Sequence, residues 1–495
     1  MRIILRADGN SQIGLGHVMR LLALAEMLQP DFTLYFAIQN PNPALIELFI
    51  SRKIEIMPLP PESNFVQEAI WLKENILQPP DVLVLDGYKF DTQYQEVLRH
   101  EVAAMICLDD IHAFPFVADT VVNPAGGVHT TKYLLAPGSK LLTGPDYALL
   151  REPFLALAHQ IRTVEKVQRI FVNLGGADPQ NQTQWVIQEL NIQSHSFTLE
   201  VVVGSAYQNL PDLEEFSQSQ NKIKINLHQN ISAGELAKLM SNCDAAICPP
   251  STVAYEWCCV SGPLFIHRTA SNQINLESFL LKENLAFSFS QFFEILKQTD
   301  FPQKITEQLK QQRKYFYGQS RKNWQKLFFT QVYPSWVSFR AAQASDSDLL
   351  FNWINEPDVR KYSLNPAPVP LEIHESWFQK KIQDENSFIF IAELGKEPLG
   401  MIRFDLSGTE ALISYLLDKN FRGKGLASIF LKRGIAAFTA QAKNKALKVS
   451  GLVQAQNMAS VKAFEKAGFS RENYSNSQHP NLIKFSYSLT GSEGA

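Results

Sequence analysis

The sequence predicts an α/β protein with two consecutive domains of similar type and a third, smaller α+β domain. Its 495 residues are more than one ordinary core accommodates. Short apolar runs alternate with stretches of helical spacing, and this alternation restarts at residue 169. The composition then changes after VYPSW (332–336). We therefore expect domains at 1–150, 151–330 and 337–490.

The first domain has the pattern of a parallel sheet covered by helices. Its expected strands are the apolar runs at 3–5, 33–38, 81–86, 103–109 and 120–124. Runs of this kind, ending in polar residues, are typical of buried parallel strands. Val18 to Leu28 has helical spacing and follows the first strand. The order of strand and helix indicates a Rossmann-like domain.

The second domain repeats this pattern. Its expected strands lie at 169–176, 199–204, 223–230, 245–250 and 263–268. Two such domains in tandem predict a cleft between them, the usual place for a nucleotide-sugar. The amphipathic, Lys- and Gln-rich stretch 289–329 is expected to be helical. It either packs back across both domains or serves as a spacer.

The third domain mixes strand-like and helical runs in a different order. Its expected strands lie at 338–342, 388–394, 399–406, 410–418, 446–453 and 481–489. Its expected helices lie at 346–355, 375–382, 428–442 and 458–468. This order predicts an α+β domain.

Composition excludes several classes of function. The formal net charge is −3, so the surface offers no general attraction for nucleic acid or an anionic membrane. No apolar run approaches the roughly 20 residues that cross a bilayer, and MRIILRADGN lacks a signal-peptide pattern. The five cysteines have no metal or redox spacing, and His228 and His267 are isolated. We expect a cytoplasmic protein without a metal or an obligate protein partner.

The segment RADGNSQIGLGHVMR (6–20) is the first candidate site. It leads from a strand through glycines into a helix that begins near His17. Glycines allow close backbone approach to a ligand, and a helix N-terminus favours an anion. The partial positive charge at the helix N-terminus also disfavours protonation of His17. A general base must be unprotonated to act. From spacing alone, a structural glycine-rich turn is an equal alternative.

This segment resembles the opening of the UDP-sugar hydrolase family of pseudaminic acid biosynthesis (the PseG type). The resemblance extends over about 1–330 and includes VLDGY (84–88), VNPAGG (122–127), LLTGPDYALLR (141–151), VNLGGADPQNQT (172–183), PPSTVAYEWCCVSGP (249–263) and ASNQ (270–273). It implies a glycosyltransferase-B-like pair of Rossmann-like domains. It also implies hydrolytic removal of UDP from UDP-2,4-diacetamido-2,4,6-trideoxy-β-L-altropyranose with inversion.

The resemblance also implies site residues. His17 falls on the family's catalytic histidine, and Tyr88 and Asn272 match positions near the sugar. For the last two, packing or a turn is the alternative. The expected substrate or UDP contacts in the first domain are Asp8, Gly14, Gly16 and Arg20. Without a metal, helix N-termini, loop amides and Arg20 are expected to meet the charge of the leaving group.

The second domain is expected to bind the nucleotide. Gly175, Gly176 and Asp178 follow a strand, where backbone N–H groups can cradle a diphosphate. Ser251 or Thr252 can cap the next helix and also bond phosphate. In the glycosyltransferase-B folds that the resemblance implies, a carboxylate one turn later commonly holds the ribose, so this role is expected for Glu256. Simple capping is the alternative for Asp178 and Ser251. The family has glycines where this chain has Pro249 and Pro250, which lack an N–H group.

A second motif lies in the third domain. RGKGLA (422–427) follows a strand and opens a helix, and Asn457, Ser460 and AFEKAGF (463–469) come later. The pair resembles the GNAT acetyltransferase family, in which the loop binds the diphosphate of acetyl-CoA. The resemblance implies acetyl-CoA as co-substrate. The expected acetyl-CoA contacts are Leu416, Arg422, Gly423, Gly425, Ala427, Asn457 and Ser460.

One family feature is missing. The GNAT tyrosine that protonates the departing thiolate corresponds to Phe464 or a neighbour. Ser460, Tyr415 or water are the substitutes, which leaves the general acid open.

The third domain resembles the N-acetyltransferase of the same pathway (the PseH type). That resemblance implies N4-acetylation of UDP-4-amino-4,6-dideoxy-β-L-AltNAc, whose product is the substrate of the hydrolase. The expected function is therefore bifunctional, with two consecutive steps on one chain. The alternatives are a glycosyltransferase on a related UDP-sugar with a non-catalytic acetyl-CoA-binding domain, and a related sugar of different stereochemistry.

Overall fold

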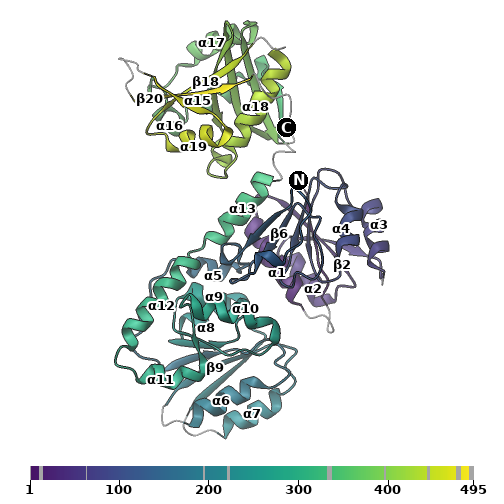
Figure 1. The fold of residues 1–495 in the computed structure, drawn as a ribbon, viewed down its shortest axis with the longest axis vertical. Helices are drawn as coiled ribbons and strands as arrows, with labels where there is room; N and C mark the ends of the chain where they lie inside the picture. Colours follow the sequence, from purple (N-terminus) through teal and green to yellow (C-terminus); the bar gives the residue numbers. More distant parts are fainter. Residues whose placement is uncertain are drawn as a thin grey trace. The chain divides into compact units, whose positions relative to one another are not determined.

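The computed structural model describes residues 2–9, 15–62, 64–192, 196–219, 223–331, 337–394, 397–442, 446–474 and 481–489 (Figure 1). The chain divides into two compact units, Met1–Gln325 and Lys326–Ala495. None of the helices in the described ranges is long and apolar enough to span a membrane. All five cysteines are buried and free.

The first sheet of unit 1 has seven parallel strands in the order β3-β2-β1-β4-β5-β6-β7. The strands are β1 (Arg2–Arg6), β2 (Thr33–Gln39), β3 (Glu55–Leu59), β4 (Val82–Asp86), β5 (Ala104–Leu108), β6 (Thr120–Asn123) and β7 (Lys140–Thr143). The helices are α1 (Gly16–Leu28), α2 (Pro43–Ser51), α3 (Phe65–Asn75) and α4 (Thr92–Leu98), with 3-10 turns η1 (Thr130–Lys132) and η2 (Pro145–Tyr147). The strand order reverses between β1 and β4, which is where ligands bind in such sheets.

The second sheet of unit 1 has six parallel strands in the order β10-β9-β8-β11-β12-β13. They are β8 (Arg169–Val172), β9 (Thr198–Val203), β10 (Lys224–Gln229), β11 (Ala245–Cys248), β12 (Leu264–Ile266) and β13 (Phe287–Ser288). Helices cover both faces, with α6 (Gln182–Ile192) and α7 (Leu210–Gln218) on one side, and α8 (Ala233–Ser241), α9 (Thr252–Val260) and α10 (Ile274–Lys282) on the other (Figure 1). The remaining short elements are α5 (Glu152–Leu157), η3 (Ser271–Gln273), η4 (Phe289–Gln291) and α11 (Phe292–Lys297).

Two helices at the end of unit 1 return the chain toward the first sheet. They are α12 (Phe301–Tyr315) and α13 (Gln319–Gln331). Trp324 of α13 donates its indole N–H to the carbonyl of Tyr147 at 2.9 Å, and Gln325 donates to the carbonyl of Met27 at 3.2 Å. The helical stretch therefore packs back on the part of unit 1 that holds the first sheet, which is one of the two alternatives expected for it.

Unit 2 holds a seven-stranded sheet in the order β14-β15-β16-β17-β18-β20-β19. Its strands are β14 (Val337–Ala341), β15 (Ser387–Leu394), β16 (Glu397–Ser407), β17 (Glu410–Leu417), β18 (Lys448–Gln454), β19 (Ser470–Glu472) and β20 (Leu482–Ser488). Its helical elements are η5 (Ala344–Asp346), α15 (Ser347–Ile354), α16 (Pro357–Lys361), α17 (Leu371–Gln383), η6 (Lys419–Phe421), α18 (Ala427–Ala442) and α19 (Met458–Ala467). All neighbouring strands are antiparallel except β17 and β18.

Candidate active sites

His17 lies in the first turn of α1, which begins at Gly16. Its side chain is 11% exposed. The backbone N–H groups of this first turn have no partner within the helix and carry partial positive charge. The sequence therefore placed His17 correctly at a helix N-terminus. Gly14, the other expected contact of this loop, lies outside the described residues.

Asp86 orients His17. It ends β4, next to β1 in the sheet, and it is fully buried. Its Oδ1 lies 2.7 Å from Nδ1 of His17. Nη2 of Arg20 lies 2.9 Å from the same nitrogen, but Arg20 also donates from Nη2 to Asp86 Oδ1 at 2.6 Å. An ionised carboxylate can only accept, so the neutral tautomer that bonds to Asp86 carries its proton on Nδ1. Nε2 is then left with its lone pair, which is the form a general base needs.

Arg20 ties this pair to a second carboxylate. It donates from Nε to Asp86 Oδ2 at 3.0 Å, from Nη2 to Asp86 Oδ1 at 2.6 Å, and from Nη1 to Asp110 Oδ2 at 3.0 Å. Burial disfavours its charge, but the two carboxylates raise the pKa of the guanidinium above its ordinary value. Because its nitrogens are directed at these carboxylates, Arg20 is a poor candidate for the leaving-group charge it was expected to meet.

Tyr88 contacts both His17 and Asp110. Its ring meets the ring of His17 edge to face with centroids 4.8 Å apart, and its hydroxyl donates to Asp110 Oδ2 at 3.4 Å. Burial, together with the charge of Asp110, raises the pKa of Tyr88 to about 12. The phenol therefore stays protonated at neutral pH. The structure thus brings His17, Arg20 and Tyr88 together, as the sequence predicted for these three.

Asp8 is engaged inside the protein. Its carboxylate accepts from Arg6 Nη1 at 2.5 Å and Nη2 at 2.7 Å, and from the backbone N–H of Gln39 at 3.1 Å. Arg6 is fully buried and also pairs with Glu68 at 2.7 Å. These bonds give Asp8 a structural role, anchoring the chain before the glycine loop, and the expected ligand contact stays a prediction.

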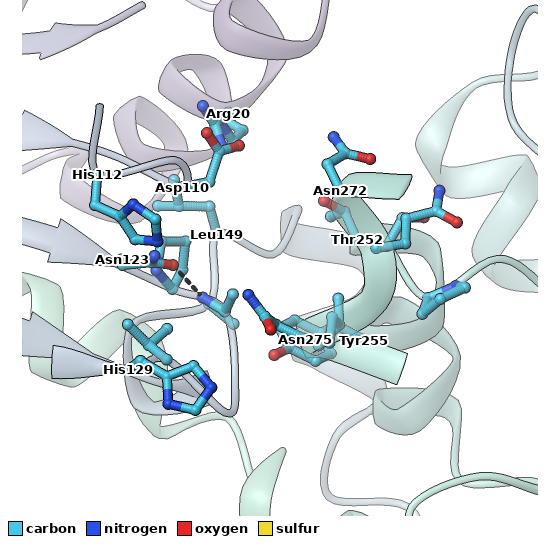
Figure 2. A pocket seen from close by; sticks show the side chains of 18 residues that line it. Arg20, Asp110, His112, Asn123, His129, Leu149, Thr252, Tyr255, Asn272 and Asn275 are labelled. Carbon is cyan, nitrogen blue, oxygen red and sulfur yellow. Dashed lines mark hydrogen bonds and ion pairs between the residues drawn. The ribbon is translucent and has the colours of Figure 1, made fainter. Parts of the chain in front are cut away.

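A cavity of about 240 Å³ lies within unit 1, between residues of its two sheets. Figure 2 shows Arg20, Asp110, His112, Asn123 and His129 on one side, facing Thr252, Tyr255, Asn272 and Asn275 on the other. Four predicted residues line it, namely Arg20, Ser251, Thr252 and Asn272. His17 and Tyr88 are not in its wall but contact Arg20 and Asp110, which are.

Two lining residues of this cavity, His112 and Asn123, are held by a buried polar network that the sequence did not reveal. Tyr133 donates to Asp109 Oδ2 at 2.6 Å, and Asn123 donates to the Tyr133 hydroxyl at 2.8 Å. The backbone N–H of His112 donates to the same Asp109 oxygen at 2.8 Å, with His112 in the left-handed region at φ 44°. Asp109 thus fixes the direction in which the His112 loop enters the cavity.

The signal for the missed residues was present in the sequence. Asp86 ends the run DVLVLD, and Asp109 and Asp110 end the run AAMICLDD. Sites in open α/β sheets collect beyond the carboxyl ends of strands. That rule led us to Tyr88, and it applies equally to these three carboxylates.

Two residues expected to contact the nucleotide, Glu256 and Asp178, have partners within the protein. Glu256 is 3% exposed, and both of its oxygens accept from Arg151, at 2.7 Å and 2.8 Å. It does not line the cavity, so this geometry gives no support to the ribose role, which stays a prediction. Asp178 accepts from the backbone N–H of Gln182 at 2.9 Å and of Thr183 at 2.7 Å. It therefore caps α6, which was the alternative for this residue.

The glycines and the α9 N-terminus remain open to a ligand. Gly175 has φ +109°, and a side-chain carbon added at Gly175 or Gly176 meets no atom within 4 Å. Ser251 precedes α9 without a side-chain capping bond, so its hydroxyl is uncommitted to the helix. Gly16 likewise has open space around it. Within the described ranges no group of three His, Cys, Asp or Glu side chains is placed to hold a metal ion.

In unit 2, the candidate site is a split in the sheet. The parallel ladder between β17 and β18 joins Glu410–Ile413 with Lys448–Gly451 and then stops. Both strands continue, β17 paired with β16 as far as Leu417 and β18 paired with β20 as far as Gln454. The backbone groups of Ser414–Leu417 that face the split are therefore free of a strand partner there, and an extended ligand can add to this edge.

The glycine loop RGKGLA lies at the end of β17 and opens α18. Gly423 and Gly425 have φ of 76° and 79°, values that favour glycine. The Arg422 side chain turns back into the protein, donating from Nε to the Leu417 carbonyl at 2.7 Å and from Nη2 to Glu356 at 2.5 Å. Arg422 thus braces the end of β17.

Asn457 and Ser460 lie at the start of α19, beside the split. Asn457 Oδ1 caps the helix by accepting from the Ser460 backbone N–H at 3.1 Å. The Ser460 hydroxyl lies 3.0 Å from the hydroxyl of Tyr415 on β17. Phe464 is 3% exposed and stacks on Phe485 with centroids 5.2 Å apart. Phe464 is therefore a core residue, and the sequence was right to look elsewhere for a proton donor.

Both units are similar in sequence to known proteins. Residues 337–470 match the model of the acetyltransferase (GNAT) domain family. The chain is 23% identical to an uncharacterized protein of Methanocaldococcus jannaschii, over 95% of this chain and 97% of that one. It is 26% identical to UDP-2,4-diacetamido-2,4,6-trideoxy-β-L-altropyranose hydrolase of Campylobacter jejuni, over 52% of this chain and 87% of that one. It is 25% identical to the spore coat polysaccharide biosynthesis protein SpsG of Bacillus subtilis, over 55% of this chain and 80% of that one. The chain therefore joins an N-terminal α/β part similar to these last two proteins to a C-terminal unit with the GNAT-type acetyltransferase fold.

Proposed function

We propose that the chain is a bifunctional nucleotide-sugar enzyme of a pseudaminic-acid-type pathway. The C-terminal unit acetylates the 4-amino group of UDP-4-amino-4,6-dideoxy-β-L-AltNAc with acetyl-CoA. The N-terminal unit hydrolyses the product, UDP-2,4-diacetamido-2,4,6-trideoxy-β-L-altropyranose, to UDP and the free sugar with inversion. The similarity to the Campylobacter hydrolase and the GNAT domain match support this pairing.

The observation that carries the hydrolase proposal is the bond between His17 Nδ1 and the buried Asp86. In this role Nε2 of His17 accepts a proton from water as the water oxygen attacks the anomeric carbon. The bond from that carbon to the diphosphate oxygen breaks, and its electron pair leaves with UDP. Asp86 stabilises the imidazolium that forms, without taking the proton itself.

The leaving diphosphate needs positive partners, and Arg20 is already paired with two carboxylates. The α9 N-terminus with Ser251 and Thr252, together with the amides of Gly175 and Gly176, takes this role. Asn272 lines the same cavity and is assigned to the sugar or to the water. Tyr88, held against His17, is assigned to the sugar side of the reaction.

The acetyl transfer proposal is supported by the split between β17 and β18. The pantetheine arm of acetyl-CoA adds to the free edge of β17 at Leu416, and the amides of the loop from Gly423 through Gly425 to Ala427 bind its diphosphate. Arg422 supports that edge by bonding the Leu417 carbonyl. Asn457 contributes through the α19 start that it caps.

A stepwise assay of the purified chain tests both halves. The substrates are UDP-4-amino-4,6-dideoxy-β-L-AltNAc alone, the same with acetyl-CoA, and the 4-acetamido compound alone, each followed by NMR and by release of CoA and UDP. We expect CoA release only in the second mixture, and UDP release in the second and third. If UDP appears only when a sugar or lipid acceptor is added, the N-terminal unit is a glycosyltransferase. Acetyl-CoA binding without acetyl transfer means that the GNAT unit is a binding module.

A further inference from the structure

The acetyl transfer proposed above needs a proton at the departing sulfur, and Phe464, at the position of the GNAT tyrosine, cannot supply it. Phe464 has no exchangeable proton and is packed among Phe469, Phe485 and Tyr415. A side chain with a hydroxyl or an acid group has to reach the split from another position. The described part of unit 2 offers such a group on the neighbouring strand.

Tyr415 lies on the stretch of β17 that has left β18. It comes two residues after Ile413, the last residue paired across the split, and it is paired with Ile402 of β16 on the other side. Its ring lies on the side of the sheet that α18 and α19 cover, 6.1 Å from the ring of Phe430 and 5.9 Å from that of Phe464. The hydroxyl is thus held between the strand edge and the start of α19.

Ser460 fixes where that hydroxyl points. The two oxygens are 3.0 Å apart, and either can donate to the other. Ser460 is itself held in the first turn of α19, because Asn457 accepts from its backbone N–H. A hydroxyl both donates and accepts, so when Ser460 donates to Tyr415, the phenol proton is free to point elsewhere.

The surroundings keep this phenol protonated. Burial raises the pKa of Tyr415, while the bond to Ser460 lowers it by a smaller amount. Because the pKa of this phenol lies above the pH of the cell, the phenol keeps its proton and can donate it, as a general acid must. By contrast, His374, the buried histidine of α17, has its Nε2 on the Ser347 carbonyl at 2.9 Å and packs on Phe378. It is committed to the helix packing.

We propose that the Tyr415 hydroxyl, held by Ser460, is the proton donor to the sulfur of CoA in acetyl transfer by unit 2. The amine nitrogen of the sugar bonds to the acetyl carbon, and the carbon–sulfur bond breaks with its electron pair on sulfur. The phenol proton moves to that sulfur. The proton that the nitrogen loses passes to solvent, and solvent restores the phenol, so charge and atoms balance. This proposal rests on the acetyltransferase activity proposed above.

The test uses the full chain with Tyr415→Phe, Ser460→Ala and Ser460→Thr. Tyr487→Phe is the matched control, since it removes the same hydroxyl from β20, whose Tyr487 ring packs on Phe469. Each variant is titrated with acetyl-CoA for its Kd. CoA release to the 4-amino sugar is then measured in single turnovers across pH, because product release can mask chemistry.

We expect Tyr415→Phe to leave the acetyl-CoA Kd within twofold and to slow the single-turnover rate about 100-fold, within the range for general acid catalysis. The wild-type rate should fall as pH rises through the phenol pKa, because the donor is lost, and Tyr415→Phe should lack this limb. Ser460→Ala should lose about tenfold, and Ser460→Thr should recover most of it, since the positioning hydroxyl returns. Tyr487→Phe should match the wild type.

Three results overturn the inference. A Tyr415→Phe rate within threefold of wild type, or an unchanged basic limb, makes the pair structural. A loss confined to the Kd makes it a binding contact. If the wild-type chain binds acetyl-CoA but acetylates no amino sugar, the proposed function itself fails, and this is seen before any variant is made.

Discussion

The two candidate sites handle protons with opposite kinds of side chain. In unit 1, His17 is oriented by Asp86 inside a network of buried charges that includes Arg20 and Asp110. In unit 2, Tyr415 is oriented by Ser460, and both groups are uncharged. A buried charge must keep all of its partners, whereas a hydroxyl can exchange one partner for another at small cost. Changes in the first site should therefore cost more, in rate and in stability, than changes in the second.

The largest expected effect comes from His17→Ala. Loss of the base should reduce UDP release from the 4-acetamido substrate by about 1000-fold, within the range for general base catalysis. CoA release by the same protein should stay at the wild-type rate. The matched control is His100→Ala, an exposed histidine after α4, which should leave both activities unchanged. If His17→Ala lowers both activities, the two sites are not independent.

The converse variant is Gly425→Val. The backbone at φ 79° disfavours a β-branched residue, and the side chain occupies the space that the diphosphate needs. We expect the Kd for acetyl-CoA to rise about 100-fold, because the loop amides can no longer surround the diphosphate. UDP release should not change. Gly408→Val carries similar strain at φ 60° in the turn before β17 and separates strain from binding. Equal losses in both variants would contradict a role for the loop in acetyl-CoA binding.

Asp86→Asn should have the next largest effect. An amide can donate to Nδ1 and so favour the tautomer whose Nε2 carries the proton, which removes the base. We expect kcat for UDP release to fall about 100-fold with KM little changed, as measured by steady-state kinetics. Asp91→Asn is the control, since asparagine caps a helix as well as aspartate does, and Asp91 caps α4. A change in KM alone would point to substrate contact instead.

The smallest effect on activity is expected for Glu256→Ala. Removing one partner of a buried pair leaves Arg151 uncompensated, so unfolding of unit 1 should become easier by about 2 kcal/mol, since Arg151 is partly exposed. KM for the UDP-sugar should stay within twofold. Thermal unfolding and kinetics on the same sample check both. A tenfold rise in KM with unchanged stability would instead support the ribose role expected from the sequence.

The sequence predicted the fold because strand and helix periods are local. The apolar runs around β1, β4 and β5 and the helix at Val18–Leu28 appear where they were expected. Short edge elements such as β3, β13 and β19 were missed, because few residues carry their pattern. The prediction that His17 opens a helix rested on the same local logic and is confirmed.

Side-chain pairing across the fold was harder to predict. Glu256 was assigned to ribose because glycosyltransferase-B folds commonly have a carboxylate at that place, but Arg151, 105 residues away, donates to both of its oxygens. Asp8 was assigned to a ligand, and its partners are Arg6 and the backbone of Gln39 on the next strand. Asp86 was not identified as a site residue, because its role depends on its contact with a histidine 69 residues away. Burial and partners of charged groups depend on the tertiary structure, which a local pattern does not contain.

The most direct measurement is the fate of oxygen from water. The purified chain is incubated with UDP-4-amino-4,6-dideoxy-β-L-AltNAc and acetyl-CoA in H₂¹⁸O. The masses of the products are measured by mass spectrometry at early times, before the free sugar exchanges its anomeric oxygen with water. We expect the 4-acetamido UDP-sugar as an intermediate, then unlabelled UDP and a diacetamido sugar carrying one ¹⁸O. Label in UDP, or UDP release that requires an acceptor other than water, would contradict attack by water at the anomeric carbon.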